Sequence, residues 1–290
     1  MTTKIVDEQI AANRSGIGHW DSFAGHRTRL TAEICARAPE AGVGRLCLLG
    51  AGNAYDVDLA VLADRYAEIH LVDIDGQALA RAFENADDTT RARLKLHSGV
   101  DVSGVLDRLL SWSRRSGATA SVEGDLDPAV SRVMALLPGP FDVVVSCCLI
   151  TQLQLELLAL VPDRHPAFEA LRTAVNAIHL RLLARLLVPG GKALLVTDLT
   201  SNLTYPLEDV PDDADLGALM GNLIYAGNVI AASHPGLLSA EFRRNPALKR
   251  DWSSRFPVGP WLWHNGPERI FLVYGFEISR LPQAGSPDSP

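Results

Sequence analysis

The stretch Arg45-Leu46-Cys47-Leu48-Leu49-Gly50-Ala51-Gly52-Asn53, with Ile69-His70-Leu71-Val72-Asp73-Ile74-Asp75 after it, decides the fold. It predicts an apolar strand, a glycine turn, a helix and a second apolar strand that ends in acids. The glycines let the backbone approach a ligand closely, because a Cβ there would clash. Asp73 follows Gly52 by 21 residues, about the distance at which a strand-end acid meets a pair of ribose hydroxyls. The pattern indicates a cofactor that contains a nucleoside.

The spacing of the glycines argues against a nicotinamide cofactor. The dinucleotide fingerprint is G-x-G-x-x-G, and its third glycine position is occupied here by Tyr55. A large side chain at that point blocks close packing of the helix on the strand and crowds a pyrophosphate. An adenosine cofactor without phosphates does not need the third glycine, so the turn favours that class.

The composition is that of an ordinary globular protein, with 47% hydrophobic and 21% charged residues among 290. The net charge is −7 and no long basic run is present, which argues against a nucleic-acid partner. The four cysteines have neither disulfide nor zinc spacing, and no group of His, Asp and Glu has ligand spacing. No signal peptide and no apolar run that could span a bilayer is evident. We therefore expect a cytoplasmic protein with no membrane partner and no metal.

Apolar periodicity predicts five β-α units followed by a closing pair of strands. The expected strands cover residues 45–49, 68–73, 94–97, 141–146, 193–198, 260–264 and 269–277. The expected helices lie before the first strand, from Asp56 onward after it, and near 77–84, 102–114, 127–137, 149–187, 215–231 and 237–248. This order divides the chain into an N-terminal helical lid (1–43), a main domain (44–281) with a helical insert at about 199–257, and a disordered tail (282–290).

Four motifs in this order resemble the class I, Rossmann-like S-adenosylmethionine-dependent methyltransferase superfamily over roughly residues 44–277. They are Leu49-Gly50-Ala51-Gly52-Asn53, Leu71-Val72-Asp73-Ile74-Asp75, Phe141-Asp142-Val143-Val144-Val145-Ser146 and Leu187-Val188-Pro189-Gly190-Gly191-Lys192-Ala193-Leu194-Leu195-Val196. The resemblance implies an α/β fold with a doubly wound, mostly parallel seven-stranded sheet whose last strand is antiparallel. It also implies S-adenosyl-L-methionine as the cofactor.

The same resemblance implies roles for single residues. The turn formed by Gly50, Ala51, Gly52 and Asn53 would pass beneath the methionine part of the cofactor. Asp73 would accept hydrogen bonds from both ribose hydroxyls, with Asp75 as the alternative. The remaining contacts implied are Asp101 near the adenine amino group, and Ser146 and Cys147 where cofactor and substrate meet. The chain departs from the family's pattern at Leu48, where many members have an acid, and at Ala54, where many have a glycine.

Methyl transfer from a sulfonium is an in-line displacement, so the protein mainly has to align the nucleophile with the methyl group. A base is needed only if the nucleophile holds its proton at neutral pH. The candidates for such a group are Asp198, His264 and His234, with helix capping as the other role for Asp198 and plain surface positions for the histidines. Cys148 is expected to pack in the core or line a pocket.

We expect methyl transfer from S-adenosylmethionine to an O or N atom of a small molecule. Aromatic residues collect late in the chain with few basic partners, which favours a small organic substrate in an apolar pocket. The alternatives are a nicotinamide-dependent reductase, a non-catalytic methyltransferase-like binding or scaffold protein, and another adenosyl-sulfonium reaction such as aminopropyl transfer. An exposed apolar cap would also suit a homodimer.

Overall fold

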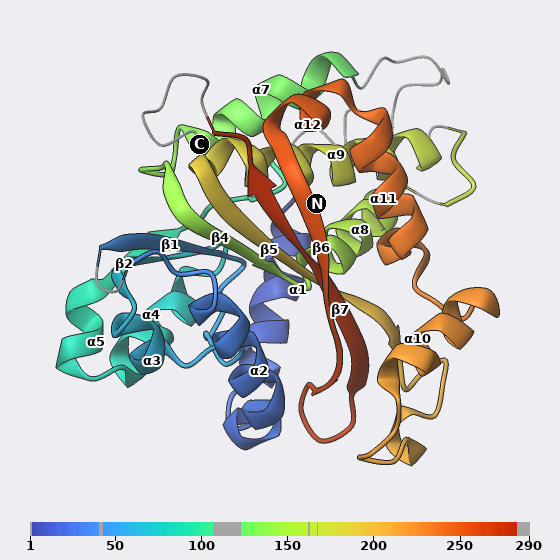
Figure 1. Ribbon diagram of the computed structural model, residues 1–290, viewed down its shortest axis with the longest axis horizontal. Helices are drawn as coiled ribbons and strands as arrows, with labels where there is room; N and C mark the ends of the chain where they lie inside the picture. Colours follow the sequence, from blue (N-terminus) through green and yellow to red (C-terminus); the bar gives the residue numbers. More distant parts are fainter. Residues whose placement is uncertain (1, 41–42, 107–122, 162, 167, 283–290) are drawn as a thin grey trace.

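The computed structural model describes residues 2–40, 43–106, 123–161, 163–166 and 168–282. Its strands are β1 (Gly44–Leu49), β2 (Tyr66–Asp73), β3 (Leu94–Ser98), β4 (Phe141–Cys147), β5 (Leu187–Ser201), β6 (Trp252–His264) and β7 (Ile270–Arg280). They form one seven-stranded sheet in the order β3-β2-β1-β4-β5-β7-β6 (Figure 1). The first five strands are parallel, and β7 runs antiparallel to both β5 and β6. The predicted α/β fold with a mostly parallel sheet and an antiparallel last strand is confirmed.

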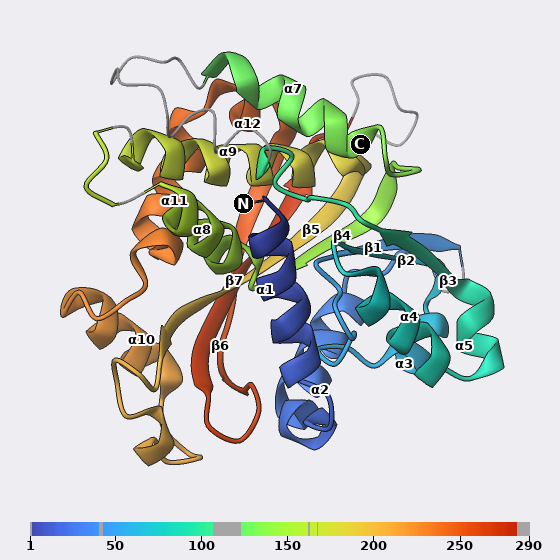
Figure 2. The same ribbon diagram turned by 180° about the vertical axis from the view of Figure 1, so that it is seen from behind.

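Helices cover both faces of this sheet, as the two opposite views show (Figures 1 and 2). The α-helices are α1 (Thr2–Ser15), α2 (Ala24–Cys35), α3 (Leu59–Ala63), α4 (Gly76–Asn85), α5 (Asp88–Arg93), α7 (Glu123–Met134), α8 (Leu149–Leu160), α9 (Phe168–Leu186), α10 (Leu216–Tyr225), α11 (Pro235–Arg244) and α12 (Pro246–Asp251). The described residues also form three short 3-10 helices: η1 (Trp20–Phe23), η2 (Leu207–Asp209) and η3 (Ala231–Ser233).

The two faces of the sheet are packed by alternate residues of the same strands, because successive side chains of a strand point to opposite faces. In β1, Cys47 and Leu49 join the apolar cluster that includes α7, α8 and α9. Leu46 and Leu48 join the cluster on the other face, which includes α2, α3 and α4. A central parallel strand buried on both faces has no polar side, which explains why its continuous apolar run was a clear signal.

The helix after β1 begins later than the sequence predicted. It starts at Leu59 rather than Asp56, because the Asp58 carboxylate caps it. Asp58 Oδ1 accepts hydrogen bonds from the backbone N–H groups of Ala60 and Val61, both at 3.1 Å. Asp56 is therefore not a first-turn helix residue and lies in the loop between the glycine turn and the cap.

Other boundaries also differ from the prediction. The structure begins β5 at Leu187 and continues it to Ser201, whereas the expected strand covered 193–198. It begins β6 at Trp252, inside the predicted 199–257 insert, and it adds α5, which was not predicted. The predicted helix at 102–114 and the tail at 282–290 fall largely outside the described residues.

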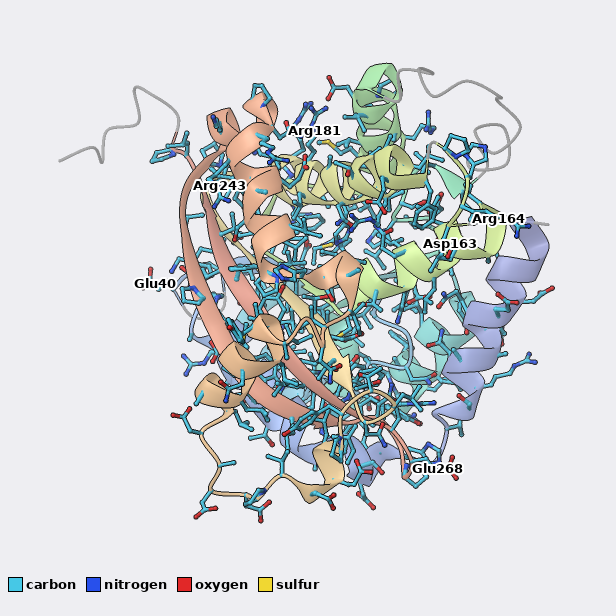
Figure 3. All side chains as sticks on the ribbon, turned by 90° about the vertical axis from the view of Figure 1, so that its right-hand side faces the viewer. Glu40, Asp163, Arg164, Arg181, Arg243 and Glu268 are labelled. Atoms are coloured by element: carbon cyan, nitrogen blue, oxygen red, sulfur yellow. The ribbon has the colours of Figure 1, made fainter. Side chains whose placement is uncertain are left out.

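The surface carries charged side chains around the sheet, with Glu40, Arg243 and Glu268 at the periphery (Figure 3). These three charged groups thus lie away from the apolar clusters that hold the layers together. In the part of the chain that the structure describes, no helix combines the length and apolar character needed to cross a membrane.

We predict that Tyr66→Phe lowers the free energy of unfolding by about 0.5–1.5 kcal/mol, because a buried hydrogen bond is lost while its acceptor keeps the bond from the Arg37 N–H. The fully buried Tyr66 hydroxyl donates to the Ile34 carbonyl oxygen at 2.9 Å and so ties α2 to β2. Urea denaturation should show a lower midpoint with an unchanged slope. An unchanged midpoint would contradict this account of how α2 is held.

Candidate functional site

A cavity of about 170 Å³ opens at the carboxyl ends of the parallel strands. Four segments that follow β1, β2, β3 and β4 contribute to it, and α1, α8 and the end of β6 complete its walls. In open α/β sheets this edge is the usual place for a ligand, because the strand-to-helix loops diverge there. The sequence-predicted Gly50, Ala51, Gly52, Asn53, Asp73, Asp101 and Cys147 all line this one cavity.

The glycine turn passes close to two neighbours that leave no room for a side chain. Gly50 and Gly52 have φ angles of +68° and +49°, which L residues rarely adopt. A Cβ on Gly50 would collide with the Leu149 side chain, and one on Gly52 would lie 2.7 Å from Asn13 Oδ1. Both glycines are therefore required by the fold itself, and they leave the backbone exposed to the cavity.

The Asp73 carboxylate holds the glycine turn in place. Its Oδ2 accepts a hydrogen bond from the Gly52 N–H at 2.8 Å, and its Oδ1 accepts one from the Asp75 N–H at 2.8 Å. Asp73 is 8% exposed, and burial raises the pKa of its carboxyl although the two backbone N–H groups lower it. Each carboxylate oxygen has further lone pairs, so Asp73 can still accept from a ligand in the cavity that it lines.

Asp75 has a structural role instead of the ligand role that was its alternative. Its Oδ1 caps α4 by accepting from the N–H groups of Gln77 and Ala78, and its Oδ2 accepts from Asn13 Nδ2 at 3.1 Å. It is 1% exposed and does not belong to the cavity lining. The same Asn13 ties α1 across the site.

Asn53 completes the attachment of α1. Its Nδ2 donates to the Asn13 carbonyl oxygen at 2.7 Å, and its Oδ1 accepts from Arg81 Nε at 3.0 Å. These hydrogen bonds place Gln9, Ala12 and Asn13 of α1 on the wall of the cavity. The arrangement agrees with the prediction that the N-terminal helices act as a lid, and that role stays a prediction.

One end of the cavity combines apolar walls with two acids. Ile74, Val100, Val102 and Leu153 supply the apolar surface, and the acids are Asp101 and Glu156. Asp101 accepts hydrogen bonds from the Ser103 and Leu106 N–H groups, at 2.8 Å and 3.0 Å. Burial, with the nearby Asp101 charge, raises the pKa of Glu156 to about 8. This end suits a flat apolar ring with polar edges, as a nucleobase has.

The opposite end of the cavity is aromatic and also acidic. It is lined by Phe23, Tyr55, Asp56, Cys147 and Trp263. Phe23 contacts both Tyr55 and Trp263 edge-to-face, with ring centroids 5.9 Å apart in each pair. Asp56 lines the cavity together with these aromatic residues, with 28% of its side chain exposed. We call this end, together with the adjoining Asp198, the acidic aromatic chamber.

Behind Asp56 stands His26, which is held in one tautomer. The Trp261 indole Nε1–H donates to His26 Nδ1 at 3.0 Å, so Nδ1 is the unprotonated nitrogen. Burial lowers the pKa of His26 to about 3, so the ring is neutral and carries its proton on Nε2. That atom lies 3.5 Å from Asp56 Oδ1 and 3.6 Å from Cys147 Sγ. The hydrogen bond of Nε2 is made to Cys147 Sγ, whereas Asp56 Oδ1 is buried without a hydrogen-bond partner among the described residues.

The ligand atoms of His26, Asp56 and Cys147 lie within 4.8 Å of one another, which is compact enough for a metal ion. A metal on His26 Nε2 would require the proton to move to Nδ1, where it would face the Trp261 N–H. Indole is only a donor, so two N–H groups would then oppose each other. The fixed tautomer thus argues against a metal at this cluster.

Two carboxyl groups of the chamber carry raised pKa values. Burial raises the pKa of Asp56 to about 7, the Asp198 charge raises it further, and the Arg27 charge acts in the opposite direction. Burial likewise raises the pKa of Asp198 to about 6, against the effect of hydrogen bonds from Cys148 and Thr151. Neither acid forms an ion pair with Lys or Arg among the residues that the structure describes. A negative charge on either carboxyl group is therefore energetically unfavourable unless a cation binds beside it.

The structure separates the other sequence candidates. Asp198 is 5% exposed and does not line the cavity. Ser146 is fully buried, and its Oγ is hydrogen-bonded to His179 Nε2 at 2.7 Å. His234 Nδ1 accepts from the Gly236 N–H at the start of α11, and His264 is an exposed residue at the end of β6. Neither histidine is part of the described cavity lining. The catalytic roles of these two histidines stay predictions, and the geometry of the cavity does not depend on them.

Comparison with known proteins adds little to this geometry. No model of a protein family matches the chain, and no curated protein matches it. A solved structure with a similar arrangement is that of the YcgJ protein from Bacillus subtilis, which is 12% identical over 88% of this chain and 98% of that chain, with a TM-score of 0.45. An arsenic(III) S-adenosylmethionine methyltransferase from Chlamydomonas reinhardtii is 16% identical over 90% of this chain and 74% of that chain, with a TM-score of 0.41. The N-methyltransferase NodS from Bradyrhizobium japonicum is 12% identical over 92% of this chain and 99% of that chain, with a TM-score of 0.45. Since these TM-scores lie below 0.5, what the chain binds has to be argued from its own residues.

We predict that the stability of Asp56→Asn relative to the unchanged protein increases with pH. The folded pKa of about 7 lies above the ordinary value of 3.8. The folded state therefore binds a proton that the unfolded state lacks, and the stability this proton contributes is full below about pH 4 and lost as the pH rises through 7. Asparagine has no such loss, so the difference in unfolding free energy should change by on the order of 1–2 kcal/mol between pH 4 and pH 8.

Chemical denaturation at several pH values measures this difference. Asp88→Asn is the matched control, because the Asp88 side chain is 98% exposed and its removal should leave the pH profile unchanged. A constant difference between Asp56→Asn and the unchanged protein across this range would contradict the burial of the Asp56 carboxyl.

Proposed function

We propose that the protein binds S-adenosylmethionine and transfers its methyl group to an O or N atom of a small molecule. The charge of the cavity is the observation that carries this proposal. Four acids line it, Asp56, Asp73, Asp101 and Glu156, whereas none of its described lining residues is Lys or Arg. A nicotinamide dinucleotide brings a negatively charged pyrophosphate, which this wall would repel. S-adenosylmethionine has no phosphate and brings a sulfonium cation.

The residues present fit the parts of this cofactor. Asp73 retains lone pairs for a ribose hydroxyl pair, and its position is fixed by two backbone hydrogen bonds. The apolar wall around Ile74 and Val102 suits adenine, and Asp101 and Glu156 stand near its polar edge. The glycine turn leaves space for the aminoacyl part, and the sulfonium would then reach the acidic aromatic chamber.

When bound, the cofactor supplies an activated methyl group, so the protein has to position the acceptor and exclude water. The chamber supports that role, because Asp56 and the apolar faces of aromatic residues line the same cavity. Of the acids and bases that line the cavity, Asp56 is the proposed proton acceptor, and the neutral His26 lies 3.5 Å from its Oδ1. Asp198 acts on Asp56 through its charge.

We predict that S-adenosylhomocysteine and S-adenosylmethionine raise the melting temperature, whereas NADH and NADPH do not. At a concentration of a hundred times the dissociation constant, a ligand adds roughly 2.7 kcal/mol. For a chain of this size that corresponds to a shift of about 5–10 °C. Asp73→Ala should abolish the shift, and Asp88→Asn should retain it.

Differential scanning fluorimetry measures these shifts. Stabilisation by NADH or NADPH would support a reductase instead. No shift with any of the four ligands would favour a binding or scaffold protein without this cofactor.

A further inference from the structure

We infer that the acidic aromatic chamber binds the methyl acceptor as a cationic amine, with Asp56 holding the ammonium group and taking its proton. This assignment rests on the proposed function and narrows its acceptor to a small primary or secondary amine. The observations that point to it are the Asp56 carboxyl, which lines the cavity without an ion pair to a described Lys or Arg, and the aromatic residues that line the cavity with it.

The charge balance of the chamber favours a cationic ligand. Asp56 and Asp198 are close enough for one charge to raise the pKa of the other. The Arg27 charge lowers the pKa of Asp56, but its guanidinium lies over the Trp20 ring at 3.5 Å and donates to the Trp20 and Tyr55 carbonyl oxygens, so it forms no ion pair with Asp56. The sulfonium supplies one positive charge, and an ammonium supplies the second.

Some buried polar atoms near Asp56 have no hydrogen-bond partner among the described residues. Trp263 Nε1 is buried, makes no hydrogen bond among the described residues, and belongs to a residue that is 6% exposed and lines the cavity. Asp198 Oδ1 also has no partner, but Asp198 does not line the cavity. Buried polar atoms are normally paired, so such atoms beside a cavity indicate ligand groups that complete them. Trp263 lines the cavity, and its N–H needs an acceptor, which a cofactor carboxylate would supply.

The aromatic residues of the chamber also favour a cationic ligand. Phe23, Tyr55 and Trp263 line the same cavity as Asp56, and the edge contacts of Phe23 with the other two rings hold them in place. Rings attract cations through their negative faces, by about 0.5–2 kcal/mol per contact. A neutral hydroxyl would gain nothing from these faces and would leave one carboxylate without a counter-charge.

His26 decides which group takes the proton. Its Nδ1 accepts from Trp261, and its Nε2 already holds a proton that faces Asp56 and Cys147. It therefore cannot accept a proton from the substrate at neutral pH. Asp56 can, because the oxygen that does not face His26 is the part of the carboxylate left for the cavity.

The proposed step balances in atoms and charge. The ammonium gives one proton to the Asp56 carboxylate, and the lone pair thus freed forms the new N–C bond to the methyl group. The S–C bond breaks, and its electron pair stays on sulfur as the sulfonium becomes a neutral thioether. The product leaves as a methylated ammonium, and Asp56 later releases its proton to solvent.

Isothermal titration at pH 7.5 with two isosteric pairs tests this inference. The protein is first titrated with S-adenosylhomocysteine, and the saturated complex is then titrated with benzylamine or benzyl alcohol, and with butylamine or butanol. We expect the amine of at least one pair to bind about tenfold more tightly than its alcohol, which corresponds to about 1.4 kcal/mol. Asp56→Asn should remove the preference, Asp198→Asn should reduce it, and Asp88→Asn should retain it.

The outcomes are distinguishable. If S-adenosylhomocysteine does not bind, both the proposed function and this inference fail. If it binds but the alcohols bind as tightly as the amines, or no amine binds, only the amine assignment is overturned. A preference that survives in a folded Asp56→Asn also overturns it. Should that variant not fold, the comparison of each amine with its alcohol in the unchanged protein still decides.

Discussion

The Asp73 carboxylate, buried at the end of β2, is the interaction on which the rest of the site depends. By accepting from the Gly52 and Asp75 N–H groups, it fixes the glycine turn and the start of α4 at once. Asp75 in turn caps α4 and holds Asn13, so α1 closes over the same edge. One carboxylate thereby sets the positions of three cavity walls and still faces the cavity.

The second constraint is electrostatic. The cavity lining contains four acids and no described Lys or Arg, and burial raises the pKa of Glu156 and Asp56, as well as that of Asp198 beside the cavity. An arrangement that is unfavourable without a ligand becomes favourable when cations enter, because an opposite charge is most effective where water is excluded. Carboxyl groups whose ionisation is made unfavourable by burial are common at functional sites and less common in a purely structural core.

The sequence predicted the parts of this site that local patterns encode. The glycine turn, Asp73 and the buried strands were recognisable because an apolar run, a turn and an acid occur at a characteristic spacing. The chamber was not predictable in that way, because Trp261 and His26 meet across 235 residues and no spacing rule connects them. Asp56 was taken for a helix-start acid, since nothing local distinguishes it from Asp58, the true cap. Ser146 was expected at the site because the strand ends there, but its side chain lies on the buried face with His179.

A crystal structure of the complex with S-adenosylhomocysteine tests the central claim most directly. The account predicts that Asp73 contacts the ribose hydroxyls, that adenine lies beside Ile74 and Val102, and that the sulfur atom points into the chamber toward Asp56. A complex with adenine in the chamber, or with the ligand outside the cavity altogether, would contradict the account.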